Sequence, residues 1–175
     1  LPVREAIRML DAEGLLTVVP NTGAWVTELT SEQCQELYLM RERLEPLLLT
    51  QNVELLPIDR LDELTSLADA MEATTDVEEF LRLDRQFHLL PLGFAPSEVL
   101  RETVFNLWNR TQHYRRSATR QFYSDGDRGV HLDHRLIVNA MGRRDASEAE
   151  AALAQHIRRS RIELERHPEI FHHAH

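Results

Sequence analysis

Residues 31–52, SEQCQELYLMRERLEPLLLTQN, carry the pattern that decides the fold of this chain. Ser31 opens the segment as a residue that favours helix starts. Apolar side chains then recur at spacings of three and four, which is the period of an amphipathic helix. We therefore expect a long helix that packs this stripe against the rest of the protein. The stripe consists of Leu37, Met40, Leu44, Leu47 and Leu48.

The helical period continues toward the C-terminus, with turn residues between the segments. A second helix starts at Pro57, and Asp76 is a good cap for a third helix that runs to about Leu90. After a loop at 91–97, a long helix extends from Glu98 to about Tyr123. Two more helices lie on either side of the turn at 142–145. The fold class is thus mostly α, with an antiparallel all-α bundle of about six helices from residue 30 to 175.

The first 29 residues differ in character. A helical run from Val3 to Glu13 stops at Gly14, and the β-prone stretch 15–19 follows. Turn residues 20–23 and a second β-prone stretch, 24–27, complete a short hairpin. A helix followed by a hairpin is how a winged helix ends. Because such a unit buries too little apolar surface to fold alone, we expect residues 1–29 to be the C-terminal part of a larger winged-helix domain.

Composition excludes several classes of protein. Twenty basic and 29 acidic residues give a net charge of −9, so DNA contact must be local rather than spread over the surface. No segment reaches the length of a membrane helix, and the start has no signal-peptide pattern. The single cysteine, Cys34, allows no internal disulfide. These features predict a cytoplasmic protein with no membrane partner.

The N-terminal residues resemble the GntR family of transcription factors, which bind DNA through a winged helix-turn-helix. The resemblance implies a recognition helix that begins inside this chain, with two earlier helices expected before it. It also implies operator contacts by Arg4 and by the tip of the wing, formed by Asn21, Thr22 and Gly23. The matching residues are Pro2 to Ala6, Leu10, Glu13 to Leu15, Gly23 and Val26.

The remainder of the chain resembles the ligand-sensing domain of the FadR subfamily. One departure is the turn Phe94-Ala95-Pro96-Ser97, where the family often has a small residue and Asn. The resemblance implies that Arg41 of the first bundle helix binds the effector. The matching residues are Leu37-Tyr38, Arg41, Leu44 to Pro46, Asp84 to His88, His134, Ile137, Ala140, Asp145, Ala149 and His156.

Four side chains predict a metal site. Asp84 and His88 are four residues apart, so on a helix they differ in direction by only about 40°. In two antiparallel helices, His134 and His156 lie at about the same level from the turn, and His131 lies at that level equally well. The resemblance selects His134, because Ile137 and Ala140 follow it at the family's spacing. Three imidazoles and a carboxylate suit Zn²⁺, Ni²⁺, Mn²⁺ or Fe²⁺, and ligand type does not choose among them.

A metal with open positions serves either a hydrolytic water or an incoming acid. The sequence has no His-Glu-x-x-His string, which disfavours hydrolysis, so we do not expect an enzyme. Residues 101–128 hold six arginines against three acids, which fits an anion site, a subunit contact or a solvated face. His113 is an additional candidate for the cavity wall, whereas the histidines at 172, 173 and 175 are typical of a disordered tail.

The interpretation that follows is a DNA-binding transcriptional regulator. Its helical domain is expected to bind one divalent metal and a small organic acid that changes operator binding, and the protein is expected to be a homodimer. A metal-dependent hydrolase on a helical bundle is the alternative, and a metal-free interaction domain is a third.

Overall fold

The computed structural model describes residues 2–20, 22–125 and 128–171, and of residues 121–125 it describes the backbone alone. In this part of the chain, six long helices follow residue 30, in agreement with the sequence. They are α2 (Ser31–Val53), α3 (Ile58–Ala73), α4 (Val77–Leu89), α5 (Glu98–Asp125), α6 (Gly129–Gly142) and α7 (Ala146–Arg166). Two short 3-10 turns, η1 (Leu90–Leu92) and η2 (Pro168–Phe171), follow α4 and α7.

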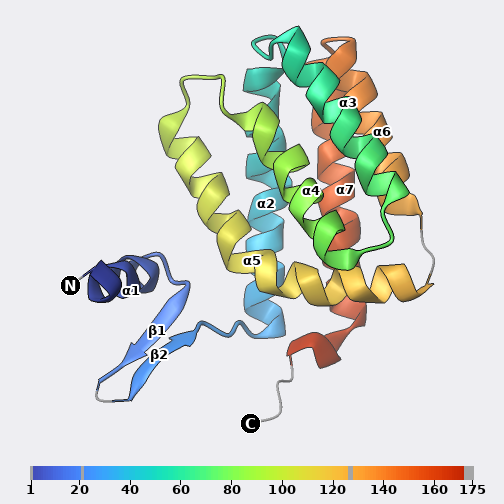
Figure 1. Ribbon diagram of the computed structural model, residues 1–175. Helices are drawn as coiled ribbons and strands as arrows, with labels where there is room; N and C mark the ends of the chain where they lie inside the picture. Colours follow the sequence, from blue (N-terminus) through green and yellow to red (C-terminus); the bar gives the residue numbers. More distant parts are fainter. Residues whose placement is uncertain (1, 21, 126–127, 172–175) are drawn as a thin grey trace.

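Helix α2 runs through the middle of the bundle and packs mainly against α7 and α5 (Figure 1). Helices α3, α4 and α6 form the neighbouring layer. Figure 1 shows α5 bending about half-way along, so that its second half passes across one end of the bundle. Near its middle, the Thr111 hydroxyl donates to the backbone oxygen of Leu107, a type of bond that often bends helices.

Side-chain caps explain several helix starts. Thr30, rather than Ser31, is the N-cap of α2, and it forms a reciprocal capping box with Gln33. Asp76 caps α4 through the amide of Glu79, and Asp145 caps α7 through the amide of Glu148. The turn before α5 is fixed by the Asn52 side chain, whose Oδ1 accepts from the amides of residues 94 and 95 at 2.7 Å each.

The predicted apolar stripe of α2 is only partly correct. Leu37 and Leu48 are buried, but Met40 and Leu47 are 45% and 44% exposed. The buried face includes charged Arg41 and Glu45 instead. A simple stripe fails here because α2 is covered on two sides, and because a charged pair can be buried when its members satisfy each other.

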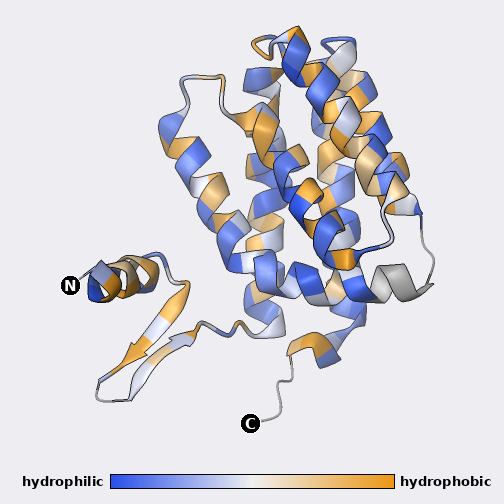
Figure 2. Cartoon of the chain, in the orientation of Figure 1, coloured by the Kyte–Doolittle hydropathy of each residue, from blue (hydrophilic) through white to orange (hydrophobic). Residues whose placement is uncertain are grey.

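The N-terminal segment forms α1 (Pro2–Ala12) and a two-stranded antiparallel hairpin of β1 (Leu16–Val19) and β2 (Gly23–Val26). Gly14 ends α1 in a left-handed conformation, at φ 72°, which favours glycine. Figure 1 shows this unit beside the bundle, joined to α2 by the segment 27–30. Figure 2 shows apolar residues on the hairpin as well as in the bundle, and Trp25 of β2 is largely exposed.

None of the described helices combines the length and the apolar character that crossing a bilayer requires.

Candidate metal centre

Three helices bring four potential ligands together inside the bundle. Asp84 and His88 lie one turn apart on α4, His134 lies on α6, and His156 lies on α7. All four side chains are buried, and one ligand atom from each lies within 4.8 Å of the others. The structure thus places the four residues named from the sequence around one point.

The spacing of their atoms fits a shared ion. Nε2 of His88 and Nε2 of His134 lie 3.6 and 3.5 Å from Oδ1 of Asp84. None of these three atoms has a hydrogen-bond partner among the described residues. Atoms that each lie about 2.1 Å from one ion are about 3.0–3.5 Å apart at the usual ligand angles. Buried polar atoms without partners, at this spacing, are what a metal site looks like before the ion is added.

The protonation states also fit a cation. Burial, reinforced by the neighbouring His156, holds the pKa values of His88 and His134 well below the usual range, so both imidazoles are neutral. Burial opposes ionisation of Asp84, but the adjacent Arg115 guanidinium lowers the pKa of this carboxyl overall. Neutral imidazoles and an ionised carboxylate are the forms that bind metals.

His156 is oriented by a carboxylate on α6. Its Nδ1 lies 3.5 Å from Oδ2 of Asp133, and Asp133 is held in turn by Arg159, whose Nε donates to Oδ2 at 2.8 Å. At this distance Nδ1 makes no hydrogen bond among the described residues, so the carboxylate acts on His156 through its charge. A carboxylate behind an imidazole favours one direction of the ring.

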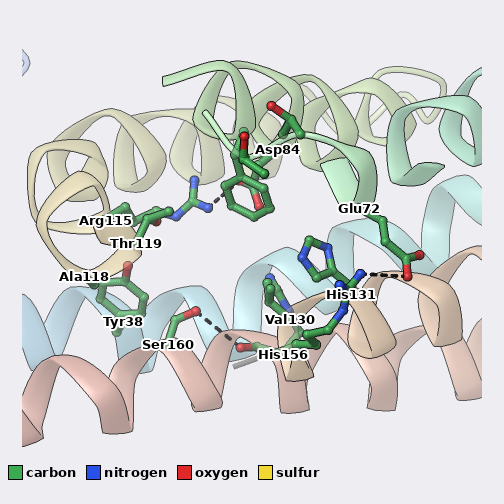
Figure 3. Close-up of a pocket in the computed structure, with 14 residues that line it drawn as sticks. Tyr38, Glu72, Asp84, Arg115, Ala118, Thr119, Val130, His131, His156 and Ser160 are labelled. Carbon is green, nitrogen blue, oxygen red and sulfur yellow. Dashed lines mark hydrogen bonds and ion pairs between the residues drawn. The ribbon is translucent and has the colours of Figure 1, made fainter. Parts of the chain in front are cut away.

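A cavity of about 250 Å³ adjoins the cluster, and Asp84 and His156 are part of its wall. Figure 3 shows Asp84 on one side, Arg115 and Tyr38 at one end, and His131 toward the other. The wall mixes apolar and polar side chains. The other lining residues are Glu72, Thr74, Thr75, Phe80, Ala118, Thr119, Arg128, Val130 and Ser160.

A stack of rings and guanidinium groups supports the Arg115 end of this cavity. Arg115 pairs with Oδ2 of Asp84, and its Cζ lies 4.4 Å from the ring centroid of Trp108. Cζ of Arg41 lies 4.5 Å from the same ring. Trp108 also donates from Nε1 to Glu45 at 3.0 Å. Arg115 is therefore a cation held in a fixed plane at the cavity wall.

Residues 36–159 match the FCD domain family. The chain belongs to the FCD family. Within it, the chain is 30% identical over 166 residues to the HTH-type transcriptional regulator YdhC of Bacillus subtilis, covering 89% of this chain and 70% of that protein. It is 27% identical over 165 residues to the Nta operon transcriptional regulator of Aminobacter aminovorans, covering 90% of this chain and 74% of that protein.

Solved structures agree. A GntR family transcriptional regulator from Pseudomonas syringae pv. tomato has a TM-score of 0.68 at 27% identity, over 97% of this chain and 70% of that one. McbR/YncC of Escherichia coli has a TM-score of 0.81 at 24% identity, over 94% and 84%, which shows a shared fold. The GntR resemblance of the sequence is confirmed, and these relatives do not support the hydrolase alternative.

The other histidines considered from the sequence are not among the four clustered residues. His131 lines the cavity and packs edge-on against Phe80, at 5.9 Å between ring centroids, but it is not one of the four clustered residues. His113 is exposed and is not a lining residue. The histidines at 172, 173 and 175 lie outside the described residues.

Arg41 is not in the cavity wall. It is 3% exposed, pairs with Glu45, and donates from NH1 to Thr111 at 2.9 Å. Direct binding of an effector by Arg41 would require this buried pair to open, because its donors already have partners.

At the N-terminus, Arg4 on α1 is exposed, and so are Thr22 and Gly23 at the hairpin turn. Gly23 has φ 147°. Asn21 lies outside the described residues.

Three residues at or beside the candidate site were missed from the sequence. The role of Asp133 has no sequence signal, because its partner His156 is on another helix. In the sequence, Trp108 is indistinguishable from an ordinary core residue. Arg115 was one of four arginines of α5 between which the sequence did not choose, and its ion pair with Asp84 at the cavity wall is what distinguishes it.

Proposed function

We propose that this chain is the sensing part of a GntR-type transcriptional regulator, holding one divalent transition metal and a small organic acid. Residues 30–175 form the sensing domain, and residues 1–29 form the end of the winged-helix DNA-binding domain. The observation that carries the proposal is the set of four converging ligand atoms beside a cavity with a fixed arginine.

Asp84, His88, His134 and His156 hold the metal. The donor set suits Zn²⁺, Ni²⁺, Mn²⁺ or Fe²⁺. When bound, the ion supplies a positive charge and open positions for an oxygen ligand. The relatives that the chain resembles are named transcriptional regulators, so we assign the ion to effector binding rather than to hydrolysis.

Arg115 is the residue that meets the acid. It is the cation nearest the cluster, it lines the cavity, and the indole of Trp108 holds its plane. A planar guanidinium suits the two oxygens of a carboxylate. This replaces the direct role expected for Arg41, which instead packs against the Trp108 ring with its Cζ 4.5 Å from the centroid.

Helix α5 links the cavity to the N-terminal unit. Tyr114, next to Arg115, accepts from the backbone amide of Leu29 in the connecting segment. One turn earlier, the guanidinium of Arg110 lies beside Gly14 at the end of α1. An acid that binds Arg115 therefore contacts the same helix that makes both of these contacts with the N-terminal unit. Effector and operator then bind with reciprocal effects on each other's affinity.

Arg4 and the wing tip, Asn21, Thr22 and Gly23, contact the operator in this proposal. Arg4 and the described part of the tip are exposed, as such contacts require. A symmetric homodimer reads two half-sites, and the protein acts in the cytoplasm, where its DNA partner is found.

Elemental analysis of the dialysed protein tests the metal. To remove adventitious binding, His172, His173 and His175 are replaced by alanine. We expect about one transition metal per chain. The Asp84→Ala and His156→Ala variants should lose it together with the thermal stabilisation that short carboxylic acids give the loaded protein. Full metal content in both variants would contradict the four-ligand site.

A further inference from the structure

The hydroxyl of Tyr38 is a buried polar group at the cavity wall without a partner among the described residues. Tyr38 lies on α2 and is only 1% exposed. Buried hydroxyl groups in folded proteins nearly always have a hydrogen-bond partner. A ligand in the adjoining cavity is one way to supply it.

The surroundings of Tyr38 fix its ring and keep its proton. Cζ of Arg41 lies 4.8 Å from the ring centroid. Burial raises the pKa of Tyr38 to about 12, although the positive charges of Arg41 and Arg115 act in the opposite direction. At neutral pH the hydroxyl therefore keeps its hydrogen and can donate it.

Arg115 and Tyr38 lie at the same end of the cavity, as Figure 3 shows. The rest of the wall mixes the apolar side chains of Phe80, Ala118 and Val130 with polar ones, among them several threonine and serine hydroxyls. Arg128, also at the wall, forms an ion pair with Glu72, with 3.1 Å between its Nη2 nitrogen and Oε1. A ligand thus finds the guanidinium of Arg115, the hydroxyl of Tyr38 near it, which is buried without a partner among the described residues, and apolar contacts for part of its body.

We propose that Tyr38 determines effector specificity by donating a hydrogen bond to a second oxygen, a hydroxyl or carbonyl, of the acid that Arg115 binds. This inference rests on the proposed function. A cavity of about 250 Å³ has room for roughly eight water-sized groups, at about 30 Å³ for each, and so for a small acid. The effector class is therefore a short hydroxy or oxo carboxylic acid rather than a plain fatty acid.

Isothermal titration calorimetry of the zinc-loaded protein tests this inference. The probes are butanoate and its three hydroxybutanoate isomers, together with pentanoate and its oxo derivative levulinate. We expect at least one oxygenated acid to bind about tenfold more tightly than its plain counterpart. In Tyr38→Phe, which keeps the ring beside Arg41, that acid should bind only as tightly as the plain one. Zinc content and affinity for the plain acids should not change.

Tyr114→Phe is the matched control, because its hydroxyl bonds to Leu29 rather than facing the cavity. It should keep the preference for the oxygenated acid. Equal binding of plain and oxygenated acids by the wild type would overturn the inference while leaving the proposed function standing. A preference that persists in Tyr38→Phe, or an equal loss for all acids in that variant, would also overturn it. If no acid binds the zinc-loaded wild type, the proposed function itself fails.

Discussion

The guanidinium of Arg115 lies over the indole of Trp108, with Cζ 4.4 Å from the ring centroid, while one of its NH₂ groups pairs with Asp84. One arginine thus contacts a proposed metal ligand, an aromatic ring and the effector cavity. An ammonium group cannot reproduce this geometry, because it is a point charge without a plane.

Arg115→Lys should therefore weaken acid binding without unfolding the protein. We expect the affinity of the metal-loaded protein for short carboxylic acids to fall about tenfold, since bidentate pairing is lost. Calorimetry measures the affinity, and elemental analysis checks that the metal remains. Arg116→Lys is the control, because Arg116 points away from the cavity and pairs with Glu78 at the surface. Equal losses in both variants would argue against a specific role for Arg115.

The two histidines of α6 should differ in their effect on metal binding. His134 is one of the clustered residues, whereas His131 lines the cavity one turn away. His134→Ala should abolish stoichiometric metal binding, because it removes one of four ligands. His131→Ala should retain about one metal per chain by elemental analysis. The reverse result would exchange the two histidines in the proposed site.

Asp133 should affect metal affinity without touching the ion. Its carboxylate lies 3.5 Å from Nδ1 of His156. In Asp133→Asn we expect about a 10- to 100-fold loss of zinc affinity, measured by competition with a chelator, which is typical when the group that orients a ligand is changed. Asp69→Asn is the control, because Asp69 pairs with Arg135 at the exposed surface. An unchanged affinity in Asp133→Asn would show that His156 is oriented by packing alone.

Much of this arrangement could be predicted from local sequence. Helix periods and caps place α2 to α7 within a few residues, because capping and apolar spacing act over short distances. The ligand pair Asp84 and His88 follows from one helix. Placing His134 and His156 beside them needed a family resemblance to decide against His131, since helical geometry alone allows both.

The rest depends on tertiary packing, which local patterns do not contain. Arg41 and Glu45 are buried on a helix whose apolar stripe indicated another inner face, because their mutual pairing makes burial tolerable. The partnership of Asp133 with His156 joins residues 23 positions apart on two helices whose relative rotation no sequence pattern specifies. Trp108 and Arg115 lie seven positions apart on α5 and so share one face of that helix, but the sequence does not show that this face turns toward the cavity.

Cys34 should be unreactive in the folded protein. It is fully buried in α2, and burial raises the pKa of its thiol from 9.0 to about 12. Ellman's reagent at pH 8 should react slowly with the native protein and rapidly in denaturant, because the thiolate is the nucleophile. Since the unfolded thiol ionises first, this group lowers stability as pH rises above about 9. Fast native labelling would contradict the packing around α2.

Tyr114 should hold the connecting segment against α5. Its hydroxyl accepts from the amide of Leu29, and its ring stacks on Phe171 at 5.0 Å. Tyr114→Phe keeps the ring and removes the hydroxyl, so we expect a loss of about 1 kcal/mol in the free energy of unfolding. Hydrogen exchange at the Leu29 amide should become faster, because its acceptor is gone. Tyr38→Phe should leave exchange at Leu29 unchanged, since the Tyr38 hydroxyl does not bond to Leu29.

If α5 transmits the effector signal through the bond between Tyr114 and Leu29, acid binding to the metal-loaded wild type should alter hydrogen exchange at the Leu29 amide. Tyr114→Phe should then remove that response while retaining acid affinity. An unchanged response in the variant would place the coupling elsewhere, with the contact of Arg110 and Gly14 as the next candidate on the same helix.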